Sequence, residues 1–437
     1  MRRRRRRSGG ITFGTVLALA FTLLVLGGLA YLLPKLAGDI DLRVDPQRLG
    51  VAVDAALRGA PNASALPAAQ PEATPATAPP LDVSTVAPAA TPATVRAFSF
   101  TAGGSIAVDT QIQKACTGAD GYTFGPVFQA LAPSLTGNLN LATLENLVVP
   151  NEKLTDVNMP ADALAALRAC GFDTLCTGFY GALNNGLTGL SQTLQAITLN
   201  GMNAYGVYSS QESRKHVVTL TAGDVTVALL SFQSELSAAG KKRTTAEEQA
   251  FVIAPLTLPT ITADITAARA AGAQVVIVSL CWGKVGATAP SNTQKELAQA
   301  IANAGADVIL GTHSGALQPV EVLSATRADG SVHQVLCAYS LGNLLESDRA
   351  DRESISGALL HVNMQYDLAA DNLTFESLTY TPTYVWRGRV EGKTVYRVLR
   401  SNAEPPAEMD SDQRKVMERC LKLVRDAWAG SPVTEAQ

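Results

Sequence analysis

Residues 274–310, QVVIVSLCWGKVGATAPSNTQKELAQAIANAGADVIL, decide the fold class of this 437-residue chain. The stretch opens with Gln274–Leu280, a run rich in valine and isoleucine that is typical of a buried strand. A helical segment, Thr293–Ala304, comes next, and a second short apolar strand, Asp307–Leu310, ends the stretch. Strand, helix and strand in this order predict a βαβ unit with two parallel strands.

Strands and helices also alternate on the N-terminal side of this unit. The expected strands are Ala97–Ala102, Leu139–Leu144, Gly171–Cys176 and Val225–Phe232. One expected helix ends near Cys170, another spans 187–198, and a third aligns Ile261, Ile265 and Ala268 on one face, with Thr260 as its N-cap. We expect the Gly103-Gly104-Ser105 segment after the first strand to form a tight turn.

The C-terminal part has a different sequence pattern, which is typical of antiparallel strands followed by one helix. The expected strands are Val335–Ser340, Gly357–Met364, Leu373–Tyr380 and Thr394–Leu399, and the closing helix runs from Ser411 to Trp428 with Asp410 or Ser411 as its cap. The sequence therefore predicts an α/β fold in which two packed β-sheets are flanked by helices. The α/β domain is assigned to residues 97–400, and the C-terminal helix and tail to residues 401–437.

The N-terminal segment predicts a membrane anchor. Residues 11–33 contain no charged side chain, and at about 1.5 Å per helical residue such a run spans a bilayer core of about 30 Å. Six arginines, Arg2–Arg7, precede it, so residues 1–10 are expected to form a basic cytoplasmic tail. A cleaved signal peptide is the alternative, but the apolar run is longer than a usual signal sequence and lacks a clear cleavage site.

Residues 34–96 follow the expected transmembrane helix and are read as a disordered stalk. Between Ala60 and Thr94 the chain is dominated by alanine, proline and threonine, and it lacks the large apolar residues that a core requires. The sequence thus predicts a single-pass protein of the cell membrane with its main domain outside the cytoplasm.

Charge and cysteine content restrict the partners and the chemistry. Removing the six arginines of residues 1–34 from the net charge of -3 leaves -9 on the rest of the chain, which argues against nucleic-acid binding. A polyanionic ligand would need a local basic patch. The six cysteines, Cys116, Cys170, Cys176, Cys281, Cys337 and Cys420, allow either disulfides or buried free thiols.

Several segments at the expected strand ends carry a recognisable pattern. They are Gly171-Phe172-Asp173, Ser279-Leu280-Cys281-Trp282-Gly283, Ala304–Gly311 continued by Thr312-His313 and Gln318-Pro319, and Tyr339-Ser340-Leu341-Gly342-Asn343-Leu344. In this order they resemble the CapA family, which is linked to poly-γ-glutamate capsule synthesis and whose fold is similar to calcineurin-like metallophosphatases. The resemblance covers about Phe98 to Asn343 and implies a two-sheet fold with Asp, Asn and His side chains on one or two divalent metal ions.

The sequence departs from the family pattern at most of the implied metal ligands. The first strand ends in Gly103-Gly104-Ser105 without a carboxylate, and the family's Asn-Leu-Glu is Thr143-Leu144-Glu145. The implied Asn-Asn-His, Asp-Tyr-Gly, His-Trp-Gly and Gly-x-His-Pro-His segments are Phe179-Tyr180-Gly181, Asn184-Asn185-Gly186, Cys281-Trp282-Gly283 and Gly311–Gly315, which keeps His313.

Histidines are scarce in the whole chain: His216, His313, His333 and His361 are the only four. A two-metal site usually takes about three imidazoles and a bridging carboxylate. We therefore predict no metal centre of the family type and no cofactor. A single zinc ion on Cys281 and His313 is the remaining metal option, and it lacks a third ligand.

The expected ligand-binding cleft is lined by Ser105, Thr143, Glu145, Trp282, His313, Gln318 and Asn343. Structural alternatives stand beside these assignments. His313 can be a hydrogen-bonded pocket histidine, Glu145 can pair with a lysine or cap a loop, and Trp282 can be core packing. Asn343 can hold its own turn, and Cys281 can be a buried thiol.

These expectations lead to a functional hypothesis: a membrane-anchored CapA-like protein that synthesises or handles a capsule or cell-envelope polymer. Its partners would be that polymer or the envelope synthesis machinery. One alternative is an active metal-dependent phosphatase-like or polymer-cleaving hydrolase with a site rearranged around Glu145, Cys281 and His313. A second alternative is a structural envelope scaffold. The catalytic residues, if any, are not identified by the sequence.

Overall fold

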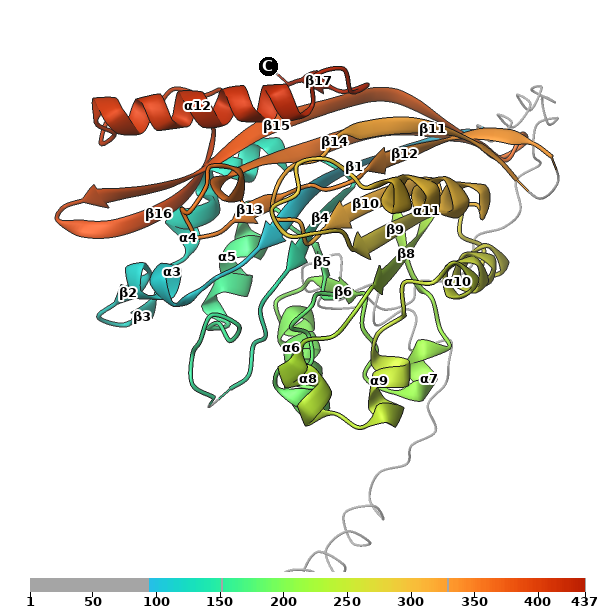
Figure 1. Cartoon of the computed structure of the whole chain (residues 1–437), viewed down its shortest axis with the longest axis horizontal. Coiled ribbons are helices and arrows are strands. Elements are labelled where there is room, and N and C mark those ends of the chain that lie inside the picture. The colour runs from blue at the N-terminus through green and yellow to red at the C-terminus, as the bar shows by residue number, and fades with distance from the viewer. Residues whose placement is uncertain (1–93, 151, 328–329, 437) are drawn as a thin grey trace, which may run out of the picture. The chain divides into compact units, whose positions relative to one another are not determined.

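The computed structural model describes residues 94–150, 152–327 and 330–436, all within one compact unit, Ala89–Gln437 (Figure 1). The expected basic tail, the transmembrane helix 11–33 and residues 34–93 of the stalk lie outside the described residues. Among the residues that the structure describes, no helix is both long and apolar enough to cross a membrane.

The larger sheet has parallel strands on one side and antiparallel strands on the other. Its main path is β16 (Lys393–Arg400), β15 (Asn372–Val390), β14 (Ser356–Asp367), β1 (Val95–Ile106), β4 (Leu139–Leu144), β5 (Thr174–Cys176) and β6 (Asn203–Tyr205). Strands β1, β4, β5 and β6 run parallel, whereas β1, β14, β15 and β16 pair antiparallel. Two short strands complete it: β13 (Asn343–Leu345) on β1 and β17 (Thr434–Glu435) on β15.

The second sheet contains the βαβ unit that the sequence predicts. Its order is β11 (Val320–Thr326), β12 (Val332–Ala338), β10 (Val308–Thr312), β9 (Val275–Cys281), β8 (Val225–Gln233) and β7 (Val218–Ala222). The four central strands are parallel, and the two edge strands pair antiparallel. Every residue of β9 is buried, as expected for a strand covered on both faces.

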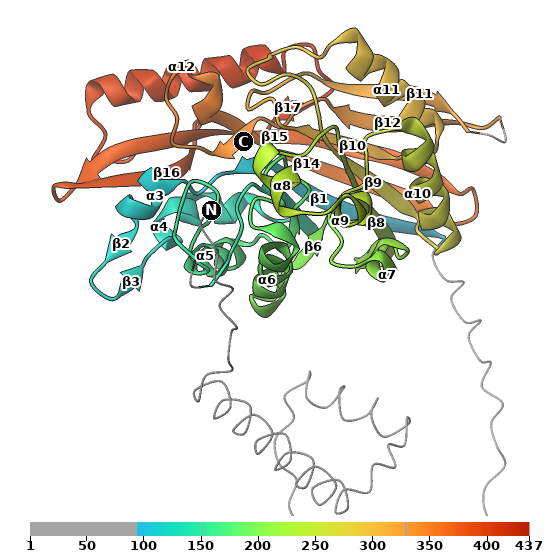
Figure 2. The same cartoon turned by 60° about the horizontal axis from the view of Figure 1, so that its bottom comes forward.

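Helices cover the outer faces of both sheets (Figures 1 and 2). The α-helices are α3 (Thr110–Ala115), α4 (Gly125–Phe128), α5 (Asp162–Cys170), α6 (Gly186–Leu199), α7 (Gln211–Arg214), α8 (Ala238–Arg243), α9 (Ala246–Val252), α10 (Leu258–Ala270), α11 (Asn292–Asn303) and α12 (Ser411–Ala427). Two 3₁₀ helices, Gln129–Ser134 and Glu353–Ile355, and the small hairpin of β2 (Thr117–Gly118) and β3 (Gly121–Tyr122) complete the described elements.

Apolar side chains fill the layers between these elements. One buried cluster lies between the two sheets and contains Phe98, Phe100, Val227, Ile277 and Leu310. Another fills the space between the second sheet and helices α10 and α11. The predicted α/β fold with two packed sheets flanked by helices is thereby confirmed.

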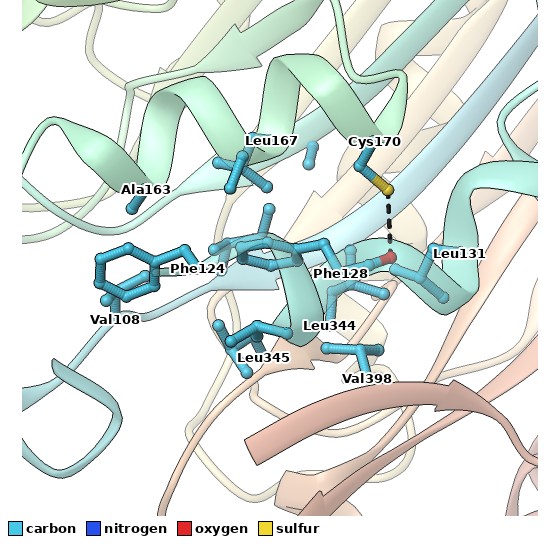
Figure 3. Close-up of a cluster of buried hydrophobic side chains, with 14 of the residues drawn as sticks. Val108, Phe124, Phe128, Leu131, Ala163, Leu167, Cys170, Leu344, Leu345 and Val398 are labelled. Atoms are coloured by element: carbon cyan, nitrogen blue, oxygen red, sulfur yellow. Dashed lines mark hydrogen bonds between the residues drawn. The ribbon is translucent and has the colours of Figure 1, made fainter. Parts of the chain in front are cut away.

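The six cysteines are buried free thiols, so the disulfide alternative is wrong for this structure. Cys170 shows how such a thiol is accommodated in the core between α4, α5 and the larger sheet (Figure 3). Its thiol donates a hydrogen bond to the carbonyl oxygen of Phe128 at 3.2 Å, and burial raises its pKa to about 11. The thiol therefore stays protonated at neutral pH.

Two local predictions are wrong. Gly103-Gly104-Ser105 does not turn, because it continues β1 and the Gly342 carbonyl packs directly against Gly104. A Cβ at Gly104 would also lie 2.6 Å from the Leu341 carbonyl oxygen, so glycine is required there by close backbone approach. Thr260 is not an N-cap, because α10 already starts at Leu258 after Thr257.

Candidate functional site

The candidate site lies where strands of both sheets end. Ser105 is the second-last residue of β1 and lies beside Thr143 of β4, and Glu145 follows directly after β4. In the second sheet Cys281 ends β9 opposite Thr312 of β10, which places His313 immediately after that strand. Since ligands of open α/β sheets gather beyond the carboxyl ends of parallel strands, this edge is the expected place for chemistry.

Glu145 connects the two sheets electrostatically. Burial is the largest influence on its carboxyl group and raises its pKa above the ordinary value for glutamate. Two smaller effects lower the same pKa: a hydrogen bond from the Ser105 side chain and the positive charge of a protonated His313. Part of Glu145 is exposed to solvent, but its carboxyl group is buried, so the loss of solvation has the largest effect on its pKa.

We expect Glu145→Gln to stabilise the folded protein at neutral pH by about 1 kcal/mol, because it removes a buried charge. Because folding raises the pKa of Glu145, a protonated Glu145 favours the folded state, and this contribution to the free energy of unfolding is fully present below the ordinary glutamate pKa. The contribution is lost as the pH rises through the pKa of Glu145 in the folded protein. Thermal unfolding of wild type and variant across that range should therefore show curves that converge in acid and separate toward neutral pH. A variant that is less stable than wild type at neutral pH would contradict the assignment.

The backbone at His313 is held in an uncommon conformation. Its φ of 85° lies in the left-handed region, which non-glycine residues rarely adopt. The adjacent Ser314 hydroxyl donates to the Ala316 carbonyl oxygen at 2.7 Å and bonds the Ser340 hydroxyl at 2.8 Å, so neighbouring contacts impose the loop shape. Strain of this kind is concentrated at functional sites.

Tyr180 joins this site although the sequence analysis did not assign it a role. Its ring lies 6.1 Å from the His313 ring, centroid to centroid, and its side chain is exposed. The backbone of Tyr180 also contacts the Cys281 thiol. The sequence did contain a signal for Tyr180, because it belongs to the Phe179-Tyr180-Gly181 segment that corresponds to the family's Asn-Asn-His.

The two thiols at the strand ends, Cys281 and Cys176, are poor ligands and poor nucleophiles. Burial raises the pKa of Cys281 far above the ordinary thiol value, and the charge of Glu145 adds to the effect. Burial raises the pKa of Cys176 in the same way, and its thiol donates to the Ser231 hydroxyl at 3.4 Å. A thiol must lose its proton to bind a metal ion or attack a substrate, so both act as packed polar groups here.

This donor set fits a dinuclear metal centre poorly. The carboxyl group of Glu145 and the imidazole of His313 meet at the strand ends beside two protonated thiols, and the charge of Glu145 also acts on the carboxyl group of Glu346. In the part of the chain that the structure describes, no group of three or more His, Cys, Asp or Glu side chains is placed to hold a metal ion. The loss of the metal centre stays a prediction.

Three of the expected cleft residues are engaged in packing and loop contacts. Trp282 is buried, stacks on Tyr339 and donates from Nε1 to the Tyr339 carbonyl oxygen at 3.0 Å. Gln318 is fully buried and donates from Nε2 to the Ala287 carbonyl oxygen at 2.9 Å. Asn343 donates from Nδ2 to the Ser354 carbonyl oxygen at 3.2 Å, so it holds a neighbouring loop rather than its own turn.

The remaining histidines lie away from this site. His216 is exposed near Glu212, and His333 lies in β12. His361 lies in β14, where its ring nitrogens face the hydroxyl groups of Thr101 at 3.2 Å and Thr381 at 2.8 Å. Burial lowers the pKa of His361 to about 4, so it is neutral at physiological pH.

A known protein family matches the part of the chain that contains the strand-end site. The family described as "Bacterial capsule synthesis protein PGA_cap" matches residues 99–348, a range that contains all seven residues of the expected cleft.

Two curated proteins are similar over long segments. The chain is 26% identical over 284 residues to the PGA biosynthesis protein CapA of Bacillus subtilis (strain 168), which covers 63% of this chain and 69% of that protein. It is 25% identical over 194 residues to the capsule biosynthesis protein CapA of Bacillus anthracis, covering 44% of this chain and 45% of that protein.

Solved structures with a related arrangement are more distant. The NAD nucleotidase of Haemophilus influenzae gives a TM-score of 0.40 with 12% identity, covering 78% of this chain and 57% of that chain. A putative 5'-nucleotidase of Staphylococcus aureus gives a TM-score of 0.38 with 13% identity, covering 75% and 58% respectively.

Proposed function

The chain belongs to the bacterial capsule synthesis protein family PGA_cap, and from this premise we propose that it synthesises or handles a capsule or cell-envelope polymer of the poly-γ-glutamate type. The observation that carries the proposal is the family match over residues 99–348. This range contains the whole second sheet, the parallel strands of the larger sheet and the strand-end site. The name of the Bacillus subtilis relative refers to PGA biosynthesis, and that of the Bacillus anthracis relative refers to capsule biosynthesis.

The proposed role does not use the two-metal hydrolysis of metallophosphatases. Support comes from the strand ends among the described residues, where Glu145 and His313 meet and no group of three or more His, Cys, Asp or Glu side chains is placed to hold a metal ion. Ser105 and Thr143 occupy positions at which the family pattern has ligands, and both are buried hydroxyl residues. On this proposal the partly exposed Glu145, His313 and Tyr180 contact the polymer or a protein of its synthesis machinery.

We also propose that the protein is tethered to the cell membrane with its α/β domain on the outer side. The uncharged residues 11–33 and the six preceding arginines support this topology. On this proposal the tether would hold the domain close to an envelope polymer.

Metal analysis separates this proposal from the active-hydrolase alternative. We expect purified full-length protein to contain far less than one tightly bound transition-metal ion per chain. His313→Ala should leave the measured metal content unchanged, because no metal depends on this side chain. The measurement is elemental analysis by mass spectrometry after exchange into metal-free buffer.

The control variant is His216→Ala, which removes an exposed imidazole that pairs with Glu212 and is not among the donors at the strand ends. One or two tightly bound ions per chain that disappear in His313→Ala and persist in His216→Ala would refute the metal-free site. Such a result would favour a hydrolase built around Glu145 and His313.

A further inference from the structure

A polar pocket lies on the outer face of the larger sheet. Its volume is about 260 Å³, and strands β1, β14 and β15 supply residues to its wall. Side chains of these strands such as Phe100 and Val362 pack in the cluster between the two sheets. Because side chains along a strand alternate between its faces, the residues beside them point to the outer face. Those that line the pocket are all polar: Ser99, Thr101, His361, Asn363, Thr379 and Thr381.

The histidine in this pocket leaves one threonine hydroxyl proton unused. Nδ1 of His361 lies 3.2 Å from Oγ1 of Thr101, and its Nε2 lies 2.8 Å from Oγ1 of Thr381. Burial lowers the pKa of His361 to about 4, so at neutral pH its ring has one N–H donor and one acceptor nitrogen. One threonine therefore donates to the ring, whereas the other accepts from it and keeps its own proton.

The acceptor for that proton has to come from the pocket. In either tautomer of His361, one of the two hydroxyl groups is free to donate, and neither forms another hydrogen bond with a described residue. Thr101 and Thr381 are buried, with 1% and 5% of their surface exposed. A buried donor without an acceptor is costly, so an acceptor atom of a ligand in the pocket would be stabilised there.

Arg400 gives the pocket a positive charge that no lining carboxylate balances. Among the described lining residues it is the one charged side chain. Its guanidinium group forms no ion pair or hydrogen bond with a described residue. The carboxylate of Glu435 accepts a hydrogen bond from the lining residue Asn402, but it is already paired with Arg425 at 2.6 Å.

An oxyanion suits these donors better than a neutral or cationic ligand. A guanidinium group presents a planar fork of N–H donors that matches a carboxylate or a phosphate. The free hydroxyl proton donates to the same kind of oxygen. The volume of about 260 Å³ is slightly below the usual range of small-molecule sites, about 300–1,000 Å³, so the pocket suits a small molecule rather than a polymer.

We propose that this pocket binds a small organic oxyanion, a phosphate or a carboxylate that also carries hydroxyl groups. Arg400 holds the anionic group, and the threonine hydroxyl beside His361 donates to a further oxygen of the ligand. The proposal does not rest on the proposed function, because Arg400 and His361 lie beyond the matched segment 99–348. Thr101 also precedes Ser105 of the strand-end site by four residues, about 13 Å along an extended strand.

The test is isothermal titration calorimetry of the purified full-length protein with three matched three-carbon compounds. Glycerol 3-phosphate carries a phosphate, glycerate carries a carboxylate, and glycerol is uncharged. We expect at least one of the two anions to bind and glycerol not to bind, and the anion that binds more tightly identifies the anionic group. If neither anion binds, or if glycerol binds as tightly as the anions, the proposal is overturned.

Arg400→Gln locates the binding. This variant should bind the preferred anion about tenfold more weakly than wild type, because it removes the charged partner. Arg400 is partly exposed and unpaired among the described residues, so the variant should unfold at the wild-type temperature. Arg389→Gln is the matched control, since Arg389 is an exposed arginine of β15 that does not line the pocket. Equal affinity of Arg400→Gln and Arg389→Gln would place the ligand elsewhere and refute the site.

A second variant tests the hydroxyl groups. Thr101→Val/Thr381→Val removes both of them and keeps the β-branched shape that suits strands, so binding should again weaken about tenfold. Circular dichroism checks its fold, and if this variant does not fold, Arg400→Gln alone decides. Wild-type affinity in a folded Thr101→Val/Thr381→Val protein would contradict the role assigned to the threonines beside His361.

Discussion

Replacing Gly311 with alanine is expected to lower the free energy of unfolding by about 3 kcal/mol or more, enough to deplete the folded protein. A Cβ at this position would overlap the carbonyl oxygen of Tyr339 and lie 2.5 Å from Nε1 of Trp282. Both neighbours are fixed, because Trp282 donates to that same carbonyl oxygen in the core. Chemical denaturation of the purified variant, or its soluble yield, measures the loss.

Gly125→Ala is the control for this substitution. Gly125 has open space around its Cα and no left-handed backbone, so alanine should be tolerated with a change of less than about 0.5 kcal/mol. If Gly311→Ala unfolded at the same denaturant concentration as wild type, the packing of β10 against the Tyr339 segment would be wrong. The position of His313, two residues later, would then be in doubt as well.

The family motif around Gly311 has a structural basis. Asp307, four residues earlier, is buried and accepts hydrogen bonds from Arg269 at 2.6 Å and from the Val276 backbone at 2.7 Å. Asp307 and Gly311 therefore fix the start and the end of β10 rather than perform chemistry. The motif therefore has a structural role that does not depend on a metal ion.

Much of the fold follows from the sequence, because its strands are buried runs of apolar residues. The predicted strand Leu139–Leu144 has the same bounds as β4, and all six of its residues are buried. The closing helix starts at Ser411 behind an Asp410 cap, as expected from capping chemistry. The local sequence specifies such elements, so they can be predicted without information from the rest of the chain.

The failures arise where distant segments meet. Gly104 was assigned to a turn, whereas its role is to admit the backbone of Gly342, which lies far along the chain. The site shows the same division. Ser105, Glu145 and His313 were expected at the strand ends and meet there, but Trp282 and Gln318 are held inside by contacts that no local pattern predicts.

The role in capsule synthesis predicts a large effect in the bacterium that carries this gene. Deleting the gene should abolish the surface polymer, because the family premise makes this protein part of its production. Expression of the wild-type chain should restore the polymer, and expression of the misfolding variant Gly311→Ala should not. Loss of restoration by Glu145→Gln and His313→Ala together would place the role at the strand ends and would exclude a passive scaffold.

The most direct test of the account is therefore the amount of poly-γ-glutamate-type polymer on the cell surface, measured as glutamate released by acid hydrolysis of washed capsule. The account predicts background levels in the deletion strain and wild-type levels after complementation with the full chain. Unchanged polymer in the deletion strain would contradict it.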